Sequence, residues 1–224
     1  VALCRQDLCL ERHEVIPRQH NQRLFGMLRE LMPHGRLAEQ GVDAIAYGCG
    51  PGSFTGLRIA ASAVQGLAFA NNLPCFPVST LLCQAQAALR LGLVFPDDTV
   101  ISALDARINE IYYAVVHFKD GIAAMSASPR ASSPADVAVA EDLAALRGIG
   151  NGFHLLDAMP APLRARLLSV EPDLLPTARD MVPLAQQSLR RGLVQEAAEV
   201  CPVYVRDEIS WKKLGEQGRA GAEQ

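Results

Sequence analysis

The chain has 224 residues, half of them apolar, and a formal net charge of −3. This length and composition predict a globular chain with a sizeable core, built as one large domain or two small ones. No basic run stands out, which argues against nucleic-acid binding by the chain alone. Arg, Asp, Gly or Pro interrupts every apolar run before the roughly 20 residues of a membrane span, and early charges argue against a signal peptide. We therefore expect a cytoplasmic protein without membrane contact.

The cysteine and histidine spacings do not predict a metal site. None of the six cysteines forms a C-x-x-C pair, so reduced thiols are favoured over disulfides or metal ligands. No two of the five histidines lie four residues apart, the spacing that would place two ligands on one helix face. We therefore expect no metal ion held within this chain.

The first 47 residues predict two short strands, a helix and a third strand. The short strands span residues 1–3 and 8–15, and the helix spans residues 18–32. The apolar stripe of this helix is wider than one buried face requires, which leaves room for a partner opposite the core. Residues 42–47 carry no charge after Asp43, which predicts a central strand buried on both faces.

A glycine-rich turn follows this strand, and we call it the signature loop. Its glycines permit positive φ angles and close backbone approach, and a turn of this kind before a helix often points N–H groups at a phosphate. The loop lacks the lysine of a Walker A motif, the G-x-G-x-x-G spacing and a G-x-S-x-G elbow. A phosphate cradle and a tight turn without ligand are therefore both open. The loop residues are Gly48, Gly50, Pro51, Gly52, Ser53 and Gly56.

The helix after the loop carries small residues at every fourth position. Ser62, Gly66 and Ala70 share one face, and a face of small residues lets another helix approach closely. Internal packing and a dimer seam explain this pattern equally well. A strand at residues 75–78 follows, and then a helix at residues 80–90.

The second half predicts a hairpin, a loop and three helices. Residues 100–105 and 110–118 read as strands around a short turn. The stretch 120–134 is rich in Ala, Ser and Pro and predicts a loop. Further helices are expected at 140–147, 160–168 and 181–191, a second glycine turn at 148–152, and a polar disordered tail from 216.

These elements predict an α/β chain in two halves. Pro96-Asp97-Asp98 breaks the pattern between them. The expected domains are an N-terminal lobe with the interface helices, residues 1–96, and a C-terminal lobe with a flexible tail, residues 97–224.

Five segments in the same order resemble the TsaB (YeaZ) family. The segment 47–59 is similar to its YGxGPGSFTGLRI signature, and residues 104–112 are similar to its DARMGEVY motif. Residues 18–24 resemble its first helix, residues 77–81 its GVSTL motif, and residues 202–213 its C-terminal PVYLR…WKK motif. The resemblance covers about residues 1–213, and the glycine signature and the DAR motif together are highly specific.

The resemblance implies an α/β fold of two duplicated lobes, as in the actin, hsp70 and sugar-kinase superfamily. It implies a non-catalytic subunit of the complex that attaches threonylcarbamoyl to N6 of adenosine 37 in tRNAs reading ANN codons. The implied partners are the catalytic paralogue TsaD and TsaE, which joins the complex. The chain is expected to contact tRNA only through the complex. Alone, it is expected to form a homodimer. We expect the partner interface to comprise His20, Leu24, Met27, Leu28, Leu31, Leu57, Ser62, Gly66 and Ala70.

The resemblance also implies that the chain has no catalytic, cofactor-binding or metal-binding residue. TsaD carries an H-x-x-x-H metal pair after the strand that corresponds to residues 75–78, and this chain has no histidine there. Members of the family begin with a strand and an Asp-Thr turn that precede the equivalent of Val1, so we expect this first strand to be missing from the given chain. We then expect nucleotide contacts to be weak at most, with Asp105 and Arg107 as the candidate residues. Binding of ATP or ADP at the heterodimer interface stays open.

Two other functions stay open. An ATP-dependent small-molecule kinase or ATPase of the same superfamily would need an acidic base, and Asp105 is the candidate. For Asp105, a turn-capping role in which it is bonded to Arg107 is favoured over the role of catalytic base. A metallopeptidase is disfavoured because the histidine pair is absent.

Overall fold

A computed structural model of the chain describes residues 1–5, 8–15, 20–33, 37 and 39–205. The polar tail expected from residue 216 lies outside these residues. The longest helices are α1 (His20–Leu31), α2 (Phe54–Asn71), α3 (Thr80–Arg90) and α5 (Met181–Arg190), and α4 (Ala161–Arg164) is one turn long. Short 3₁₀ segments are η1 (Pro134–Asp136), η2 (Asn151–Ala158), η3 (Ala178–Asp180) and η4 (Ala197–Glu199). No helix in the described part of the chain is both long enough and apolar enough to span a bilayer.

The largest sheet is mixed and six-stranded, in the order β10-β9-β5-β6-β7, with β8 also pairing with β6. The pairs β5–β9 and β9–β10 are parallel, and β6 is antiparallel to β5, β7 and β8. The strands are β5 (Thr99–Arg107), β6 (Glu110–Lys119), β7 (Ile122–Met125), β8 (Arg130–Ser132), β9 (Leu146–Ile149) and β10 (Leu167–Glu171).

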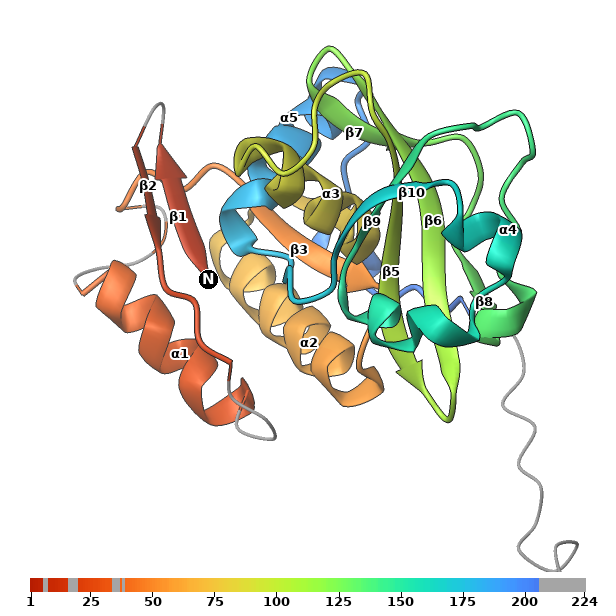
Figure 1. Cartoon of the computed structure of the whole chain (residues 1–224). Coiled ribbons are helices and arrows are strands. Elements are labelled where there is room, and N and C mark those ends of the chain that lie inside the picture. Colours follow the sequence, from red (N-terminus) through yellow and green to blue (C-terminus); the bar gives the residue numbers. More distant parts are fainter. Residues whose placement is uncertain (6–7, 16–19, 34–36, 38, 206–224) are drawn as a thin grey trace, which may run out of the picture.

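Two smaller pairs of strands complete the fold (Figure 1). β3 (Ile45–Gly50) and β4 (Cys75–Ser79) are parallel, and α2 is the crossover between them. β1 (Ala2–Arg5) and β2 (Leu8–Glu11) form an antiparallel hairpin that lies beside α1, away from the large sheet. This confirms the predicted α/β class. The duplication of two lobes and the division at residues 96 and 97 stay predictions.

Alternating side chains of the strands divide the core into layers. Phe76 and Val78 of β4 pack with α3, α5 and one face of the large sheet. Cys75 of β4 and Tyr47 of β3 point the other way, into a cluster with α2. Ile101 of β5 belongs to a third cluster, on the far face of the large sheet beneath η2 and α4. Burial of both faces of β3–β4 thus ties α2 to the body of the protein.

A buried ion pair joins the two helices on the other side of β3–β4. Arg90 at the end of α3 donates from Nε and Nη2 to the two carboxylate oxygens of Asp180, at 2.7 and 2.9 Å. The hydroxyl of Thr177 donates to the same carboxylate at 2.6 Å. Because the side chain of Asp180 is only 3% exposed, loss of either donor would leave a buried charge with fewer partners.

Several predicted elements differ from the observed ones. The predicted loop 120–134 contains β7 and β8. The predicted helix 140–147 is absent and β9 begins at its end, whereas the predicted helix 160–168 is confirmed only for the short α4, with β10 beginning after it. Pairing of β9 with β5 and of β10 with β9 overrides the local helix propensity of the Ala- and Leu-rich segments 140–147 and 160–168. The predicted central strand has only β4 as a neighbour among the described residues.

A disulfide joins Cys4 and Cys9, which face each other across the β1–β2 hairpin. The prediction of reduced thiols is therefore wrong for this pair, because cysteines five residues apart lie opposite one another only once the hairpin has formed. Cys49, Cys75 and Cys83 are free and buried, and Cys201 is free and exposed. Burial raises the pKa of the Cys83 thiol to about 12 and that of Cys49 to about 11.

Candidate partner interface

The signature loop joins the end of β3 to the start of α2. Gly50 has a φ of 126°, and a Cβ there would lie 2.6 Å from the carbonyl oxygen of Val203. Gly52 and Gly56 do not have positive φ angles, so the expected conformational role falls on Gly50 alone. Ser53 caps α2 by accepting a hydrogen bond from the N–H of Gly56.

A C-terminal segment, residues 195–204, lies over this loop. The N–H of Val203 donates to the carbonyl of Cys49 at 2.7 Å. The Tyr47 hydroxyl donates to Gln195 at 2.9 Å and accepts from the N–H of Cys201 at 3.3 Å. The backbone of this segment thus packs directly against the signature loop.

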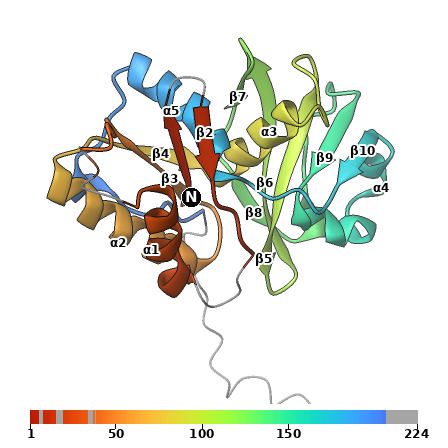
Figure 2. The ribbon, with the colours of Figure 1, turned by 90° about the vertical axis from the view of Figure 1, so that its left-hand side faces the viewer.

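A surface groove runs between α1 and α2, which lie side by side in both views (Figures 1 and 2). One cavity of about 540 Å³ is lined by residues that include Leu24, Phe25 and Ser62. A second, of about 560 Å³, is lined by residues that include Phe25, Leu28 and Ala70. Phe25 lines both cavities, so they are neighbours, and we call the two together the α1/α2 groove.

Phe54 and Arg58 of α2 meet Tyr204, which is distant in the sequence, beside the first cavity of this groove. The guanidinium of Arg58 lies 3.6 Å from the centre of the Phe54 ring and 6.0 Å from that of Tyr204. Arg58 Nε also donates to the Tyr204 hydroxyl at 3.1 Å. The two rings are 5.5 Å apart. Stacking and the hydrogen bond together hold the guanidinium in one orientation.

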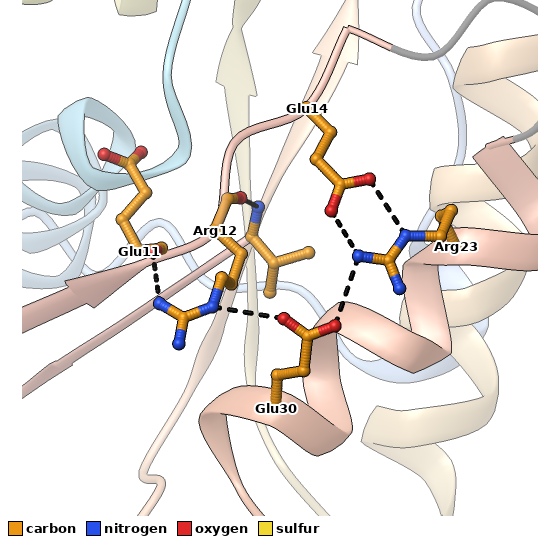
Figure 3. Close-up of polar contacts among 6 residues, drawn as sticks. Glu11, Arg12, Glu14, Arg23 and Glu30 are labelled. Carbon is orange, nitrogen blue, oxygen red and sulfur yellow. Dashed lines mark hydrogen bonds and ion pairs between the residues drawn. The ribbon is translucent and has the colours of Figure 1, made fainter.

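An ion-pair network holds α1 against the β1–β2 hairpin (Figure 3). Glu30 of α1 accepts from Arg12 at 3.2 Å and from Arg23 at 3.1 Å. Arg23 also forms a bidentate pair with Glu14. The hydrogen bond from Arg23 lowers the pKa of the Glu14 carboxyl, and Glu14 and Glu30 together raise the pKa of Arg23. The network orients α1 and thereby shapes one wall of the groove.

The structure brings most of the predicted interface residues to this region. Leu24, Leu28, Ser62 and Ala70 line the groove. Gly66 is exposed, and a Cβ there would meet nothing within 4 Å. The remaining predicted residues do not line the groove. Met27 and Leu31 lie on the buried side of α1, and Leu57 is half-buried against the signature loop. The His20 side chain lies outside the described residues.

Asp105 and Arg107, the predicted weak nucleotide contacts, lie together in one turn. The N–H of Arg107 donates to Asp105 Oδ1 at 2.7 Å, and the Arg107 guanidinium lies 3.3 Å from Oδ2. Arg107, Ile108 and Asn109 all have positive φ angles, which Asp105 stabilises by this capping bond. The favoured reading of Asp105 as a turn cap is confirmed.

Sequence reasoning missed the aromatic and cationic part of the groove. Phe25 is 46% exposed and Phe54 is 49% exposed, although both are large apolar side chains. The i, i+4 spacing of Phe54 and Arg58 on one helix face is a signal that could have been found. Nothing local pairs Tyr204 with Arg58, since 146 residues separate them.

Comparisons with known proteins agree on one family. The family model described as "TsaD: tRNA N6-adenosine threonylcarbamoyltransferase" matches residues 13–213. A "tRNA threonylcarbamoyladenosine biosynthesis protein TsaB" from Haemophilus influenzae is 33% identical over 90% of this chain and 86% of its own length. The protein of the same name from Escherichia coli is 34% identical over 90% of this chain and 87% of its own length.

A solved structure gives the same result for the fold. The protein titled "YeaZ from Pseudomonas aeruginosa" superimposes with a TM-score of 0.80 at 40% identity, over 91% of this chain and 92% of its own. The glycine signature, the DAR turn and the helices of the groove therefore belong to a shared fold. The chain is a member of the TsaB (YeaZ) family of tRNA threonylcarbamoyladenosine biosynthesis proteins, within the broader family that the TsaD model describes.

Proposed function

We propose that this chain is the non-catalytic scaffold subunit of a cytoplasmic complex that attaches threonylcarbamoyl to N6 of adenosine 37 in tRNA. Its role is to bind and support the catalytic subunit TsaD, with TsaE joining the complex and tRNA reached only through it. The names of the relatives support the pathway. The observation that carries the scaffold role is the exposed α1/α2 groove, which offers apolar side chains and a helix face of small residues to a partner.

The α2 helix supports binding of a partner helix at close range. Its inner face buries Ala61, Val64 and Ala68 against β3 and β4. Its outer face presents Ser62 and Gly66, which are exposed and pack against no core residue. Small exposed residues at this spacing allow a second helix to pack closely, so the outer face is suited to a helix–helix interface.

The start of α3 supports a non-catalytic role. The stretch 79–84, which follows β4, contains no histidine. Its serine, Ser79, stands at the N-cap position but forms no cap bond, and its Oγ is buried without a hydrogen-bond partner among the described residues. Within the described residues, no three His, Cys, Asp or Glu side chains gather as a metal site. We therefore propose that the transfer reaction takes place on TsaD.

The Gly66→Leu variant tests the interface. The open space at Gly66 lets a leucine fit the isolated chain, but its side chain would hold a partner helix away from α2. We expect size-exclusion chromatography to show loss of the complex with TsaD and of the homodimer. Gly66→Ala is the matched control, since it adds only a methyl group and should retain binding. An unchanged elution volume for folded Gly66→Leu would contradict the proposal.

The alternative function is an ATP-dependent small-molecule kinase or ATPase. The capping role of Asp105 leaves that carboxylate engaged with Arg107, and the C-terminal segment covers the signature loop. We therefore propose that the loop is structural in the isolated chain and that any ATP or ADP binds only at the heterodimer interface. Isothermal titration of the chain with ATP should give no heat of binding, and micromolar binding abolished by Gly50→Ala would support the alternative.

A further inference from the structure

The α1/α2 groove carries a positive charge in each of its two cavities. Arg58 lines the first cavity and Arg29 lines the second. Both side chains are exposed, and no Asp or Glu lines either cavity. Leu67, which lines the second cavity beside Arg29, is nine residues along α2 from Arg58, or roughly 14 Å at the rise of an α-helix. Each cavity of the groove thus has one cation, and the rest of its lining is apolar or neutral.

Neither arginine has a carboxylate partner in the described part of the chain. Arg58 bonds through Nε to the neutral Tyr204 hydroxyl, which leaves Nη1 and Nη2 for a further acceptor. Arg29 takes part in no ion pair among these residues. The neighbouring charges of α1 behave differently, because Arg23 and Glu30 are fully engaged in the network of Figure 3. On α1, the arginine that lines the groove is therefore the one without an ion pair among the described residues.

A second copy of the chain does not supply the missing carboxylates. The sequence of α2 contains no Asp or Glu, and that of α1 contains only Glu30. Glu30 is already held by Arg12 and Arg23. Two copies that meet through α1 and α2 would gather four arginines in one seam without a free carboxylate from either helix, and like charges in a seam oppose association.

We infer that the α1/α2 groove selects a partner helix whose apolar side chains are flanked by carboxylates, and so prefers a heterologous partner to a second copy. Arg58 is the stronger selector, because Phe54 and Tyr204 fix its plane and leave one edge for bidentate pairing. Arg29 supplies a second charge in the second cavity. This inference rests on the proposed function, in which the partner is TsaD.

The test compares two dissociation constants for the full chain. The first is that of the complex with TsaD from the same organism, measured by isothermal titration calorimetry at low and high salt. The second is that of the homodimer, measured by sedimentation equilibrium. The variants are Arg58→Gln and Arg29→Gln, and Arg190→Gln is the matched control because it removes one exposed positive charge from α5, outside the groove.

We expect each groove variant to weaken the complex with TsaD about fivefold at low salt, the effect of one solvent-accessible ion pair. The homodimer should keep its dissociation constant or become tighter. Added salt should weaken the wild-type complex more than either variant complex, since screening acts on the lost pairs. Arg190→Gln should match the wild type in all three measurements.

Two results would overturn the inference while the proposed function survives. One is a complex with TsaD that is unchanged in both groove variants. The other is a homodimer weakened as much as the complex, which would show that the arginines serve a second copy. Failure of the wild-type chain to bind TsaD at all would instead refute the proposed function, and this inference with it.

Discussion

Two glycine turns in this chain each join a strand to a helical segment, but different parts of the protein pack against them. The first is the signature loop between β3 and α2, and the second, residues 148–152, joins β9 to η2. In each turn one glycine has a positive φ angle, 126° at Gly50 and 94° at Gly150. In each, that glycine is pressed against protein atoms.

The two turns differ in how firmly those atoms are held. Gly50 faces the carbonyl of Val203, in an extended segment without regular secondary structure. Gly150 faces the amide of Gln84, which is fully buried and bonded to Ser102 and to the carbonyl of Leu174. A run of glycines therefore indicates close backbone approach. It does not tell whether the neighbour that packs against the turn is a ligand, a segment without regular secondary structure or the buried core.

The largest expected effect is that of Gly150→Ala. A Cβ at this position would lie 2.5 Å from the Gln84 side-chain amide and would also meet the carbonyl of Ala103. We expect a loss of about 3–5 kcal/mol in the free energy of unfolding, measured with urea and circular dichroism. Gly92→Ala is the matched control, because Gly92 has a φ of 72° but open space around it. Equal losses in the two variants would show that the clash contributes nothing.

Gly50→Ala should have a smaller effect, because the carbonyl that it meets belongs to a segment without regular secondary structure and not to the buried core. We expect a loss of about 1–3 kcal/mol, together with faster proteolysis of the segment at residues 195–204. Gly52→Ala provides the control: its Cβ would make only an ordinary contact with Leu57, at 3.9 Å, and its φ is not positive. A Gly52 variant as unstable as the Gly50 variant would contradict this assignment of the strained position.

Tyr47→Phe should have the smallest effect near neutral pH, about 1 kcal/mol, because it removes the hydroxyl that holds Gln195 and Cys201. Burial raises the pKa of Tyr47 to about 12, from an ordinary value near 10. Between about pH 10 and 12 the unfolded chain loses the phenolic proton of Tyr47, while the folded chain retains it. The contribution of the protonated Tyr47 hydroxyl to the free energy of unfolding is therefore fully present below pH 10 and is lost as the pH rises to 12. Unfolding measured across this range should show a steeper decline for the wild type than for Tyr47→Phe, and parallel curves would refute the assignment.

Elements with strong local signals could be predicted from the sequence. The α2 helix follows a glycine turn and a Ser cap, and the turn at Arg107 carries its own capping Asp105. β9 and β10 could not be predicted, because Ala- and Leu-rich segments favour helices locally and become strands only by pairing beside β5. The apolar half of the groove was visible in the stripe of α1, whereas its Arg58–Tyr204 contact depends on residues far apart in the chain.

The contact between Tyr204 and Arg58 also has a consequence for synthesis of the protein. Both helices of the groove emerge from the ribosome early, but Tyr204, which holds Arg58 in place, is made 146 residues later. Because chains begin to fold from the N-terminus during translation, a nascent chain exposes the apolar groove before its selective arginine is oriented. The proposed binding surface is therefore complete only after Tyr204 has been translated, so a chain that ends before Tyr204 lacks the hydrogen bond and the ring contact that orient Arg58.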